Sequence, residues 1–205
     1  MEHVRTQLRI VAGTLRGRKL DCIVHEDLRP TPQMVREALF SILGNAVPKR
    51  PFFDVFAGTG ANGLEAISRG ASEATFLELD SRLAAGIAGH LKRFEIERIS
   101  QVFKVDVYRW AERWLPPAGP VNIFLSPPFA DLEHRLDEFL AMVVKLMEKV
   151  PEDSTITVQG ETGFAADRLP EPDNWDCRKY GRNMLFVWVR PLSDLPEEAV
   201  ADASA

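Results

Sequence analysis

The fold is decided by residues 53–63, which read Phe53-Asp54-Val55-Phe56-Ala57-Gly58-Thr59-Gly60-Ala61-Asn62-Gly63. An apolar run typical of a buried strand leads directly into the glycines, and the residues that follow suit a helix. The glycines fit the pattern G-x-G-x-x-G, in which the chain turns sharply and a ligand approaches main-chain N–H groups near a helix start. The stretch therefore predicts a strand-to-helix turn that holds a nucleoside cofactor.

Strands and helices alternate along the rest of the chain. Buried strands are expected at 52–57, 74–79, 102–106, 121–125 and 155–159, with helices at 61–69, 83–91, 108–115 and 132–147. This alternation predicts an α/β fold with a mostly parallel sheet and helices on both faces. Two further strands, at 175–179 and 185–189, have no helix between them, so at least one is expected to be antiparallel.

The N-terminal residues predict a small extension before this alternation. Strands are expected at 8–12 and 19–23, forming a hairpin around Gly13 and Gly17. A helix is expected to open at Thr31-Pro32 and to end at Gly44. We therefore divide the chain into a basic extension (1–50), a core domain (51–190) and a flexible acidic tail (191–205).

Length and composition indicate one globular domain. The chain has 205 residues, of which 45% are hydrophobic and 27% charged, and it has two cysteines. These values suit a protein of a reducing compartment. No apolar run approaches the roughly 18 residues of a membrane span, and the first residues lack a signal-peptide core. We expect a cytoplasmic monomer without membrane contact, and the histidine and cysteine spacing predicts no metal site.

The distribution of charge is more informative than the net charge of −5. Residues 1–50 hold 9 basic and 5 acidic residues, a local charge of +4, while the remainder holds 16 basic and 25 acidic residues. Such an asymmetry can form a phosphate-facing patch on an acidic body. A solvated hairpin face with scattered arginines is an equally good interpretation of this feature alone.

Three carboxylates accompany the glycine turn. Glu78 ends the next strand, where it can accept hydrogen bonds from both ribose hydroxyls. Asp106 ends the third strand and could contact an adenine amine. Asp54 could hold either the glycine loop or an ammonium group of the cofactor. A nicotinamide dehydrogenase would use the same geometry, so this half of the site leaves the cofactor open.

The second motif is Ser126-Pro127-Pro128-Phe129, directly after a buried strand. If that strand neighbours the strand before Gly58, the two motifs lie side by side at the carboxyl edge of the sheet. The Ser126 hydroxyl and a main-chain carbonyl such as that of Pro127 can then accept hydrogen bonds from an aryl amine. The prolines fix the direction of these acceptors, and Phe129 offers a flat face for a base. Together the two motifs indicate methyl transfer from S-adenosylmethionine to a base amine.

With both motifs placed, residues 8–190 resemble the bacterial small-subunit ribosomal RNA guanine-N2 methyltransferase D family. The likeness extends to the N-terminal segments Arg9-Ile10-Val11-Ala12-Gly13, Leu15-Arg16-Gly17-Arg18-Lys19-Leu20, Leu28-Arg29-Pro30-Thr31 and Val35-Arg36-Glu37-Ala38-Leu39-Phe40. These segments are more specific than the glycine loop, which many folds share. The resemblance implies a class I methyltransferase (Rossmann-like) fold with a seven-stranded sheet and S-adenosylmethionine as donor. The acceptor that it implies is the N2 amine of a guanine in 16S rRNA or in a small-subunit assembly intermediate.

The resemblance also implies roles for individual residues. Ser126, Pro127, Pro128 and Phe129 are the expected catalytic residues, and Arg29, Thr31 and Arg36 are expected to line the substrate entrance. The expected cofactor-binding residues are Asp54, Phe56, Gly58, Thr59, Gly60, Glu78, Leu79, Asp106 and Val107.

One position departs from the family pattern, which usually has aspartate where this chain has Ser126. A neutral acceptor in place of a charged one loses about 1–2 kcal/mol of hydrogen-bond strength, so a slower but working enzyme is expected. Serine at this position also suits DNA adenine-N6 or cytosine-N4 methylation, although the chain shows no obvious target-recognition insertion. A catalytically weak RNA-binding or ribosome-assembly protein is a third interpretation.

Overall fold

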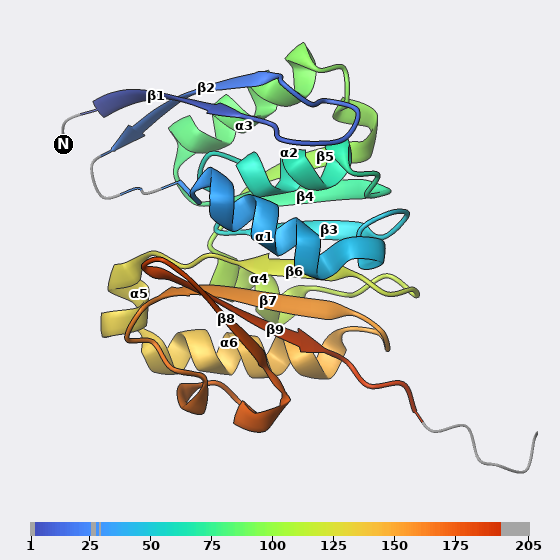
Figure 1. Ribbon diagram of the computed structural model, residues 1–205, viewed down its shortest axis with the longest axis vertical. Helices are drawn as coiled ribbons and strands as arrows, with labels where there is room; N and C mark the ends of the chain where they lie inside the picture. The colour runs from blue at the N-terminus through green and yellow to red at the C-terminus, as the bar shows by residue number, and fades with distance from the viewer. Residues whose placement is uncertain (1–2, 26–27, 29, 194–205) are drawn as a thin grey trace, which may run out of the picture.

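The computed structural model describes residues 3–25, 28 and 30–193. Its main sheet has seven strands in the order β5-β4-β3-β6-β7-β9-β8 (Figure 1). Strands β3 to β7 pair in parallel, and β9 runs antiparallel to both β7 and β8. The predicted α/β class with a mostly parallel seven-stranded sheet is confirmed. The strands are β3 (Pro51–Val55), β4 (Glu73–Glu78), β5 (Ser100–Lys104), β6 (Asn122–Leu125), β7 (Thr155–Glu161), β8 (Asp176–Tyr180) and β9 (Asn183–Val189).

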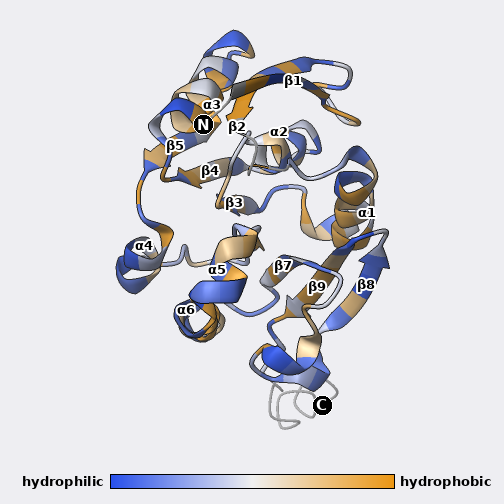
Figure 2. Cartoon of the chain, turned by 90° about the vertical axis from the view of Figure 1, so that its left-hand side faces the viewer, coloured by the Kyte–Doolittle hydropathy of each residue, from blue (hydrophilic) through white to orange (hydrophobic). Residues whose placement is uncertain are grey.

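Helices cover both faces of this sheet (Figure 2). One face packs against α1 (Gln33–Leu43), α2 (Ala61–Ser68) and α3 (Ser81–Arg93). The other face packs against α4 (Val107–Arg113), α5 (Phe129–His134) and α6 (Leu136–Lys149). Short 3₁₀ turns lie at Gly44–Ala46, Glu97–Ile99, Ala166–Arg168 and Pro172–Asn174.

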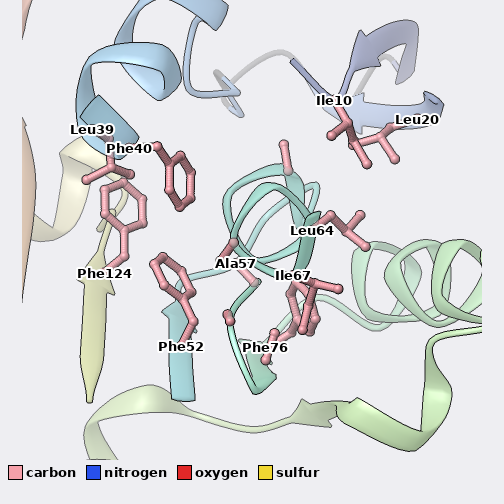
Figure 3. Packing of buried hydrophobic residues seen from close by; sticks show 14 of the residues in the cluster. Ile10, Leu20, Leu39, Phe40, Phe52, Ala57, Leu64, Ile67, Phe76 and Phe124 are labelled. Atoms are coloured by element: carbon pink, nitrogen blue, oxygen red, sulfur yellow. The ribbon is translucent and has the colours of Figure 1, made fainter. Parts of the chain in front are cut away.

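The core on the α1 and α2 face combines aromatic rings with aliphatic side chains (Figure 3). The ring centroids of Phe40 in α1 and Phe52 in β3 lie 5.8 Å apart. A Cβ atom on Gly63 would lie 2.3 Å from the ring of Phe76 in β4. The last glycine of the loop motif is therefore required for close packing of α2 against the sheet.

A hairpin of β1 (His3–Arg9) and β2 (Lys19–His25) lies across α3 (Figure 1). Alternate side chains of β2 are buried, as expected for a strand with one wet face. The main-chain N–H groups of Val11 and Ala12 donate to the carboxylate of Glu65 in α2, at 2.8 and 3.0 Å. The predicted strand 8–12 is therefore wrong in its bounds, because this carboxylate takes the chain out of the ladder after Arg9.

Two predicted helices also differ from the observed ones in their bounds. Residues 132–147 form α5 and α6 rather than one helix, since Arg135 leaves the helical conformation at φ −131°. The first helix begins at Gln33 without a side-chain cap, because the Thr31 hydroxyl donates to Gln159 instead. Most of the expected acidic tail, residues 194–205, lies outside the described residues. Within the described ranges, no helix has the length and apolarity needed to cross a bilayer.

Candidate functional site

A cavity of about 280 Å³ lies at the carboxyl ends of β3 and β6. These two strands are hydrogen-bonded neighbours, and the Ser126 N–H donates to the carbonyl of Val55 at 3.3 Å. The chain builds the sheet outward from β3 through β4 to β5, and from β6 through β7 in the opposite direction. The cavity therefore occupies the topological switch point, where open α/β sheets bind ligands.

Both sequence motifs open onto this one cavity. From the glycine loop it is lined by Phe56, Gly58 and Thr59, and from the second motif by all four residues of Ser126–Phe129. Glu78, Leu79, Asp106 and Val107 line it from the ends of β4 and β5. The predicted adjacency of the two motifs follows directly from the pairing of β3 with β6.

The glycine loop has a backbone that ordinary residues rarely adopt. Gly58 and Gly60 have φ of 54° and 74°, and a Cβ on Gly60 would lie 2.8 Å from Ile87. Phe56 has φ of 61° without being glycine, a conformation that concentrates at functional sites. Gly60 itself does not line the cavity and is the N-cap residue of α2. Its predicted direct contact with a cofactor is therefore not supported.

Asp54 holds the loop and does not reach the cavity. It is fully buried in β3, and its carboxylate accepts a hydrogen bond from the N–H of Gly63 at 2.8 Å. Burial raises the pKa of this carboxyl from 3.8 to about 8. Of the two roles predicted for Asp54 the loop-holding one is observed, and its place among the cofactor-contacting residues is corrected.

The other two carboxylates face the cavity while organising its wall. The Glu78 carboxylate accepts hydrogen bonds from the N–H groups of Gly58 at 2.6 Å and Asp80 at 2.8 Å. Burial raises the pKa of Glu78 above its ordinary value. Asp106 caps α4 by accepting a hydrogen bond from the N–H of Tyr108 at 2.9 Å. Both carboxylates keep lone pairs for ligand hydroxyl or amine groups.

The acceptor motif forms a rigid corner between β6 and α5. Ser126 is half-buried and Pro127 is buried at the edge of the sheet, whereas Pro128 is exposed and precedes the first residue of α5. Phe129 begins this helix and is half-buried at the cavity. The arrangement presents one hydroxyl and one aromatic face from a backbone that prolines restrict.

A cluster that the sequence did not reveal joins the two halves of the site. The Tyr108 hydroxyl of α4 donates to the Asp131 carboxylate of α5 at 2.5 Å, and the Arg135 guanidinium lies 4.1 Å from the centre of the Tyr108 ring. The ring of Phe56 meets Tyr108 edge to face at 5.8 Å. All four residues line the cavity. The sequence separation of 23 residues between Tyr108 and Asp131 left no pattern from which to predict this contact.

The three residues expected at the entrance differ in their placement. Thr31 lines the cavity, but Arg36 is only 1% exposed and donates from its Nη atoms to the carbonyls of Thr31 and Arg9. Arg36 is therefore a buried brace between α1 and the hairpin, and its prediction as an entrance residue is wrong. Arg29 lies outside the described residues.

The comparisons with known proteins agree with this geometry. A family model described as "Conserved hypothetical protein 95" matches residues 8–189. Ribosomal RNA small subunit methyltransferase D of Escherichia coli K12 is 36% identical over 177 residues, covering 84% of this chain and 83% of the relative. The chain belongs to the ribosomal RNA small subunit methyltransferase D family.

Several solved methyltransferase structures are similar to this chain. The structure titled "Putative methyltransferase yhhF from Escherichia coli" is 29% identical, with a TM-score of 0.73, over 91% of this chain and 99% of that chain. The 16S rRNA N2 G1207 methyltransferase of Thermus thermophilus, solved with AdoMet and guanosine, is 19% identical with a TM-score of 0.70. It covers 92% of this chain and 50% of that chain and shows likeness of fold. The chain therefore has the fold of these methyltransferases.

The cavity of this methyltransferase D family member suits S-adenosylmethionine, the donor expected from the sequence. Its volume is near the lower end of ordinary ligand sites. The Glu78 carboxylate lies at the end of β4, where a carboxylate can accept hydrogen bonds from ribose hydroxyls, and the apolar side chains of Leu79 and Val107 line the cavity beside Asp106. The described part of the chain contains no group of three or more His, Cys, Asp or Glu side chains that could hold a metal ion.

Proposed function

We propose that this protein transfers a methyl group from S-adenosylmethionine to the exocyclic N2 amine of a guanine in 16S rRNA. The observation that carries the proposal is the single cavity shared by the glycine loop and Ser126–Phe129. The family relatives are named for small-subunit ribosomal RNA, and a structural neighbour of the same fold is named for guanine N2. We infer that the protein acts as a cytoplasmic monomer on 16S rRNA or a small-subunit assembly intermediate.

In this proposal the residues of the cavity hold an unreactive amine in a reactive geometry. The donor supplies an electrophilic methyl group, which the amine nitrogen takes as the carbon–sulfur bond breaks. The Ser126 hydroxyl and the Pro127 carbonyl accept hydrogen bonds from the amine and keep its lone pair out of the ring. Phe129 stacks on the base, a contact worth about 1–3 kcal/mol. The methylated ammonium is acidic enough to lose its extra proton to water.

Incorporation of a tritiated methyl group tests the acceptor. Purified protein and labelled S-adenosylmethionine are incubated with protein-free 16S rRNA, with an assembly intermediate and with duplex DNA. Label in N2-methylguanine of the rRNA supports the proposal. Label in DNA adenine N6 or cytosine N4 would favour the alternative that Ser126 suggests. Mass spectrometry of rRNA from a deletion strain should show one lost methylguanine.

A further inference from the structure

A groove outside the cavity runs along α4, on the face of the sheet opposite the hairpin (Figure 2). Its volume is about 430 Å³, which is within the range of small-ligand sites. The end of β5 and one side of α4 supply the lining residues, which are Val105, Asp106, Arg109, Trp110, Arg113 and Trp114. Asp106 also lines the cavity, so the groove begins where the wall of the cavity ends.

The helix presents two parallel rows of side chains to this groove, because residues four apart lie one above the other on a helix. Trp110 and Trp114 form one row, with their ring centroids 5.4 Å apart. Arg109 and Arg113 form the other row, and both are exposed. Aromatic faces beside cations are the combination that binds single-stranded nucleic acid, since bases stack on the rings and phosphates pair with the cations.

Trp110 is the accessible member of the tryptophans in this chain. The chain has four tryptophans, and Trp114, Trp175 and Trp188 are only 7%, 6% and 4% exposed. Trp110 is half-buried, and its ring centroid lies 6.1 Å from that of Phe53 in β3. The indole is thus already held by its neighbours. A base that stacks on it would not have to immobilise a mobile side chain, which lowers the entropic cost of binding.

The two arginines of the groove have no anion of their own. Neither guanidinium forms a hydrogen bond or an ion pair with any residue of 3–25, 28 or 30–193. By contrast, Arg69 and Arg135 each pair with a glutamate three or four residues away. Like charges four residues apart slightly destabilise a helix, so helix stability does not explain this arrangement.

The charge of the groove suits a phosphate backbone. Its single carboxylate, on Asp106, accepts hydrogen bonds from the N–H groups of Tyr108 and Arg109 at the start of α4. The two guanidinium groups outnumber this carboxylate. They lie on a body in which acidic residues prevail, with 25 acidic and 16 basic residues in 51–205. The groove is therefore a locally cationic site beside an aromatic surface.

We propose that this groove binds a single-stranded nucleotide of the substrate rRNA outside the methylation site. Its base stacks on Trp110, and the flanking phosphates pair with Arg109 and Arg113. The segment must be unpaired, because sequence segments held in a duplex offer no free base face. The inference rests on the proposed function and adds an RNA contact on the sheet face opposite the hairpin. A strand bound at both places would cross the edge of the sheet at which the cavity opens.

Tryptophan fluorescence tests the stacking contact without turnover. The probe is oligoadenylate, which contains no guanine, and saturating S-adenosylhomocysteine keeps adenine out of the cofactor site. We expect oligoadenylate to quench the parent protein and to leave Trp110→Leu unquenched. Annealing the probe to oligouridylate should abolish the quenching, because its bases are then paired. Polyglutamate, which has charge but no bases, should leave the fluorescence unchanged.

Anisotropy of labelled oligoadenylate measures the affinity. The Kd should rise about 5- to 50-fold in Trp110→Leu, from the loss of one stacked base. In Arg109→Glu with Arg113→Glu it should rise about 10-fold or more at low salt, with a weaker salt dependence. The matched control, Arg178→Glu with Lys179→Glu, should stay within about threefold of the parent protein. Binding of S-adenosylhomocysteine within about twofold reports an intact fold in every variant.

Methyl transfer to rRNA separates this contact from the chemical step. Trp110→Leu should raise the KM for rRNA and leave kcat within about twofold, because the groove does not touch the reacting atoms. Quenching that persisted in Trp110→Leu, or equal losses from the two charge reversals, would overturn the inference. Equal quenching by polyglutamate would overturn it in favour of an acidic protein segment. Because quenching needs no turnover, it decides the inference even if the parent protein transferred no methyl group, the result by which the proposed function would fail.

Discussion

At the scale of single residues, the proposed reaction gives Ser126 the role of holding the acceptor amine. It lies at the end of β6 with its N–H bound to Val55, so the backbone of this position is fixed by the sheet. Only the side chain distinguishes it from the aspartate that the family pattern carries. A serine hydroxyl and an aspartate carboxylate at this position would accept the same amine hydrogens. The carboxylate forms the stronger hydrogen bond.

Ser126→Asp should therefore accelerate methyl transfer by about 5- to 30-fold, the equivalent of about 1–2 kcal/mol. Ser126→Ala should slow it by a comparable factor. The measurement is the initial rate of tritium transfer at saturating rRNA and donor. Binding of S-adenosylhomocysteine should stay within about twofold in both variants, since neither touches the cofactor wall. Identical rates for all three proteins would show that this side chain does not hold the amine.

Asp54 predicts a pH dependence of stability. Its pKa is raised from 3.8 to about 8, so the native state binds more protons than the unfolded state between these values. Stability from this group is thus full at low pH and lost as the pH rises toward 8, by at most about 1.4 kcal/mol per unit. Asp54→Asn should flatten that slope in thermal melts from pH 5 to 9. The exposed Asp167→Asn serves as control, and an unchanged slope in Asp54→Asn would refute the assignment.

At the scale of elements, α5 is a short helix placed over the cavity by its contacts with α4. It has six residues, too few to be stable by itself. Burial and the hydrogen bond to Asp131 raise the pKa of Tyr108, so its hydroxyl stays protonated and keeps donating. The helix that carries Phe129 is therefore positioned by a neighbour on the cofactor side.

Tyr108→Phe removes this hydrogen bond and keeps the ring between Phe56 and Arg135. We expect amide hydrogen exchange in residues 129–134 to become about 10-fold faster, from the loss of about 1.5 kcal/mol. The matched control is Tyr180→Phe, at the other tyrosine, in edge strand β8. If α5 exchanged at the parent rate, its position would depend on packing alone.

Element order could be predicted from the sequence because apolar periodicity and glycine positions report local structure. The pairing of β3 with β6 can be stated from the sequence only as a condition, because strand order depends on contacts between residues far apart in the chain. The break at Arg135 was missed because the apolar stripe from Leu132 to Met147 continues across it. Arg36 and Asp54 were misplaced for a related reason: a charged residue in a pattern does not reveal whether buried carbonyls or N–H groups satisfy it.

At the scale of the whole molecule, charge is divided between the N-terminal hairpin and the body. Arg16 and Arg18 are exposed in the β1–β2 turn, within the segment that carries the local +4 charge. A double charge reversal, Arg16→Glu with Arg18→Glu, should weaken rRNA binding by 10-fold or more at low salt and reduce its salt dependence. Filter binding from 50 to 300 mM salt measures both, with S-adenosylhomocysteine affinity unchanged.

Arg178→Glu with Lys179→Glu is the matched control for this double charge reversal. It alters two exposed basic residues in β8, at the far edge of the sheet. We expect it to leave rRNA binding nearly unaffected. Equal losses from the two changes would mean that the rRNA responds to total charge and does not dock on the hairpin.

Glu65 is fully buried, and its carboxylate accepts hydrogen bonds from the N–H groups of Val11 and Ala12, which follow β1. It belongs to α2, the same helix that begins at the glycine loop. The basic hairpin and the glycine loop are thus attached to the same helix, α2, which fixes the distance between them. Such an enzyme would select its guanine by the distance between that base and the RNA backbone bound at the hairpin, more than by the surrounding nucleotide sequence.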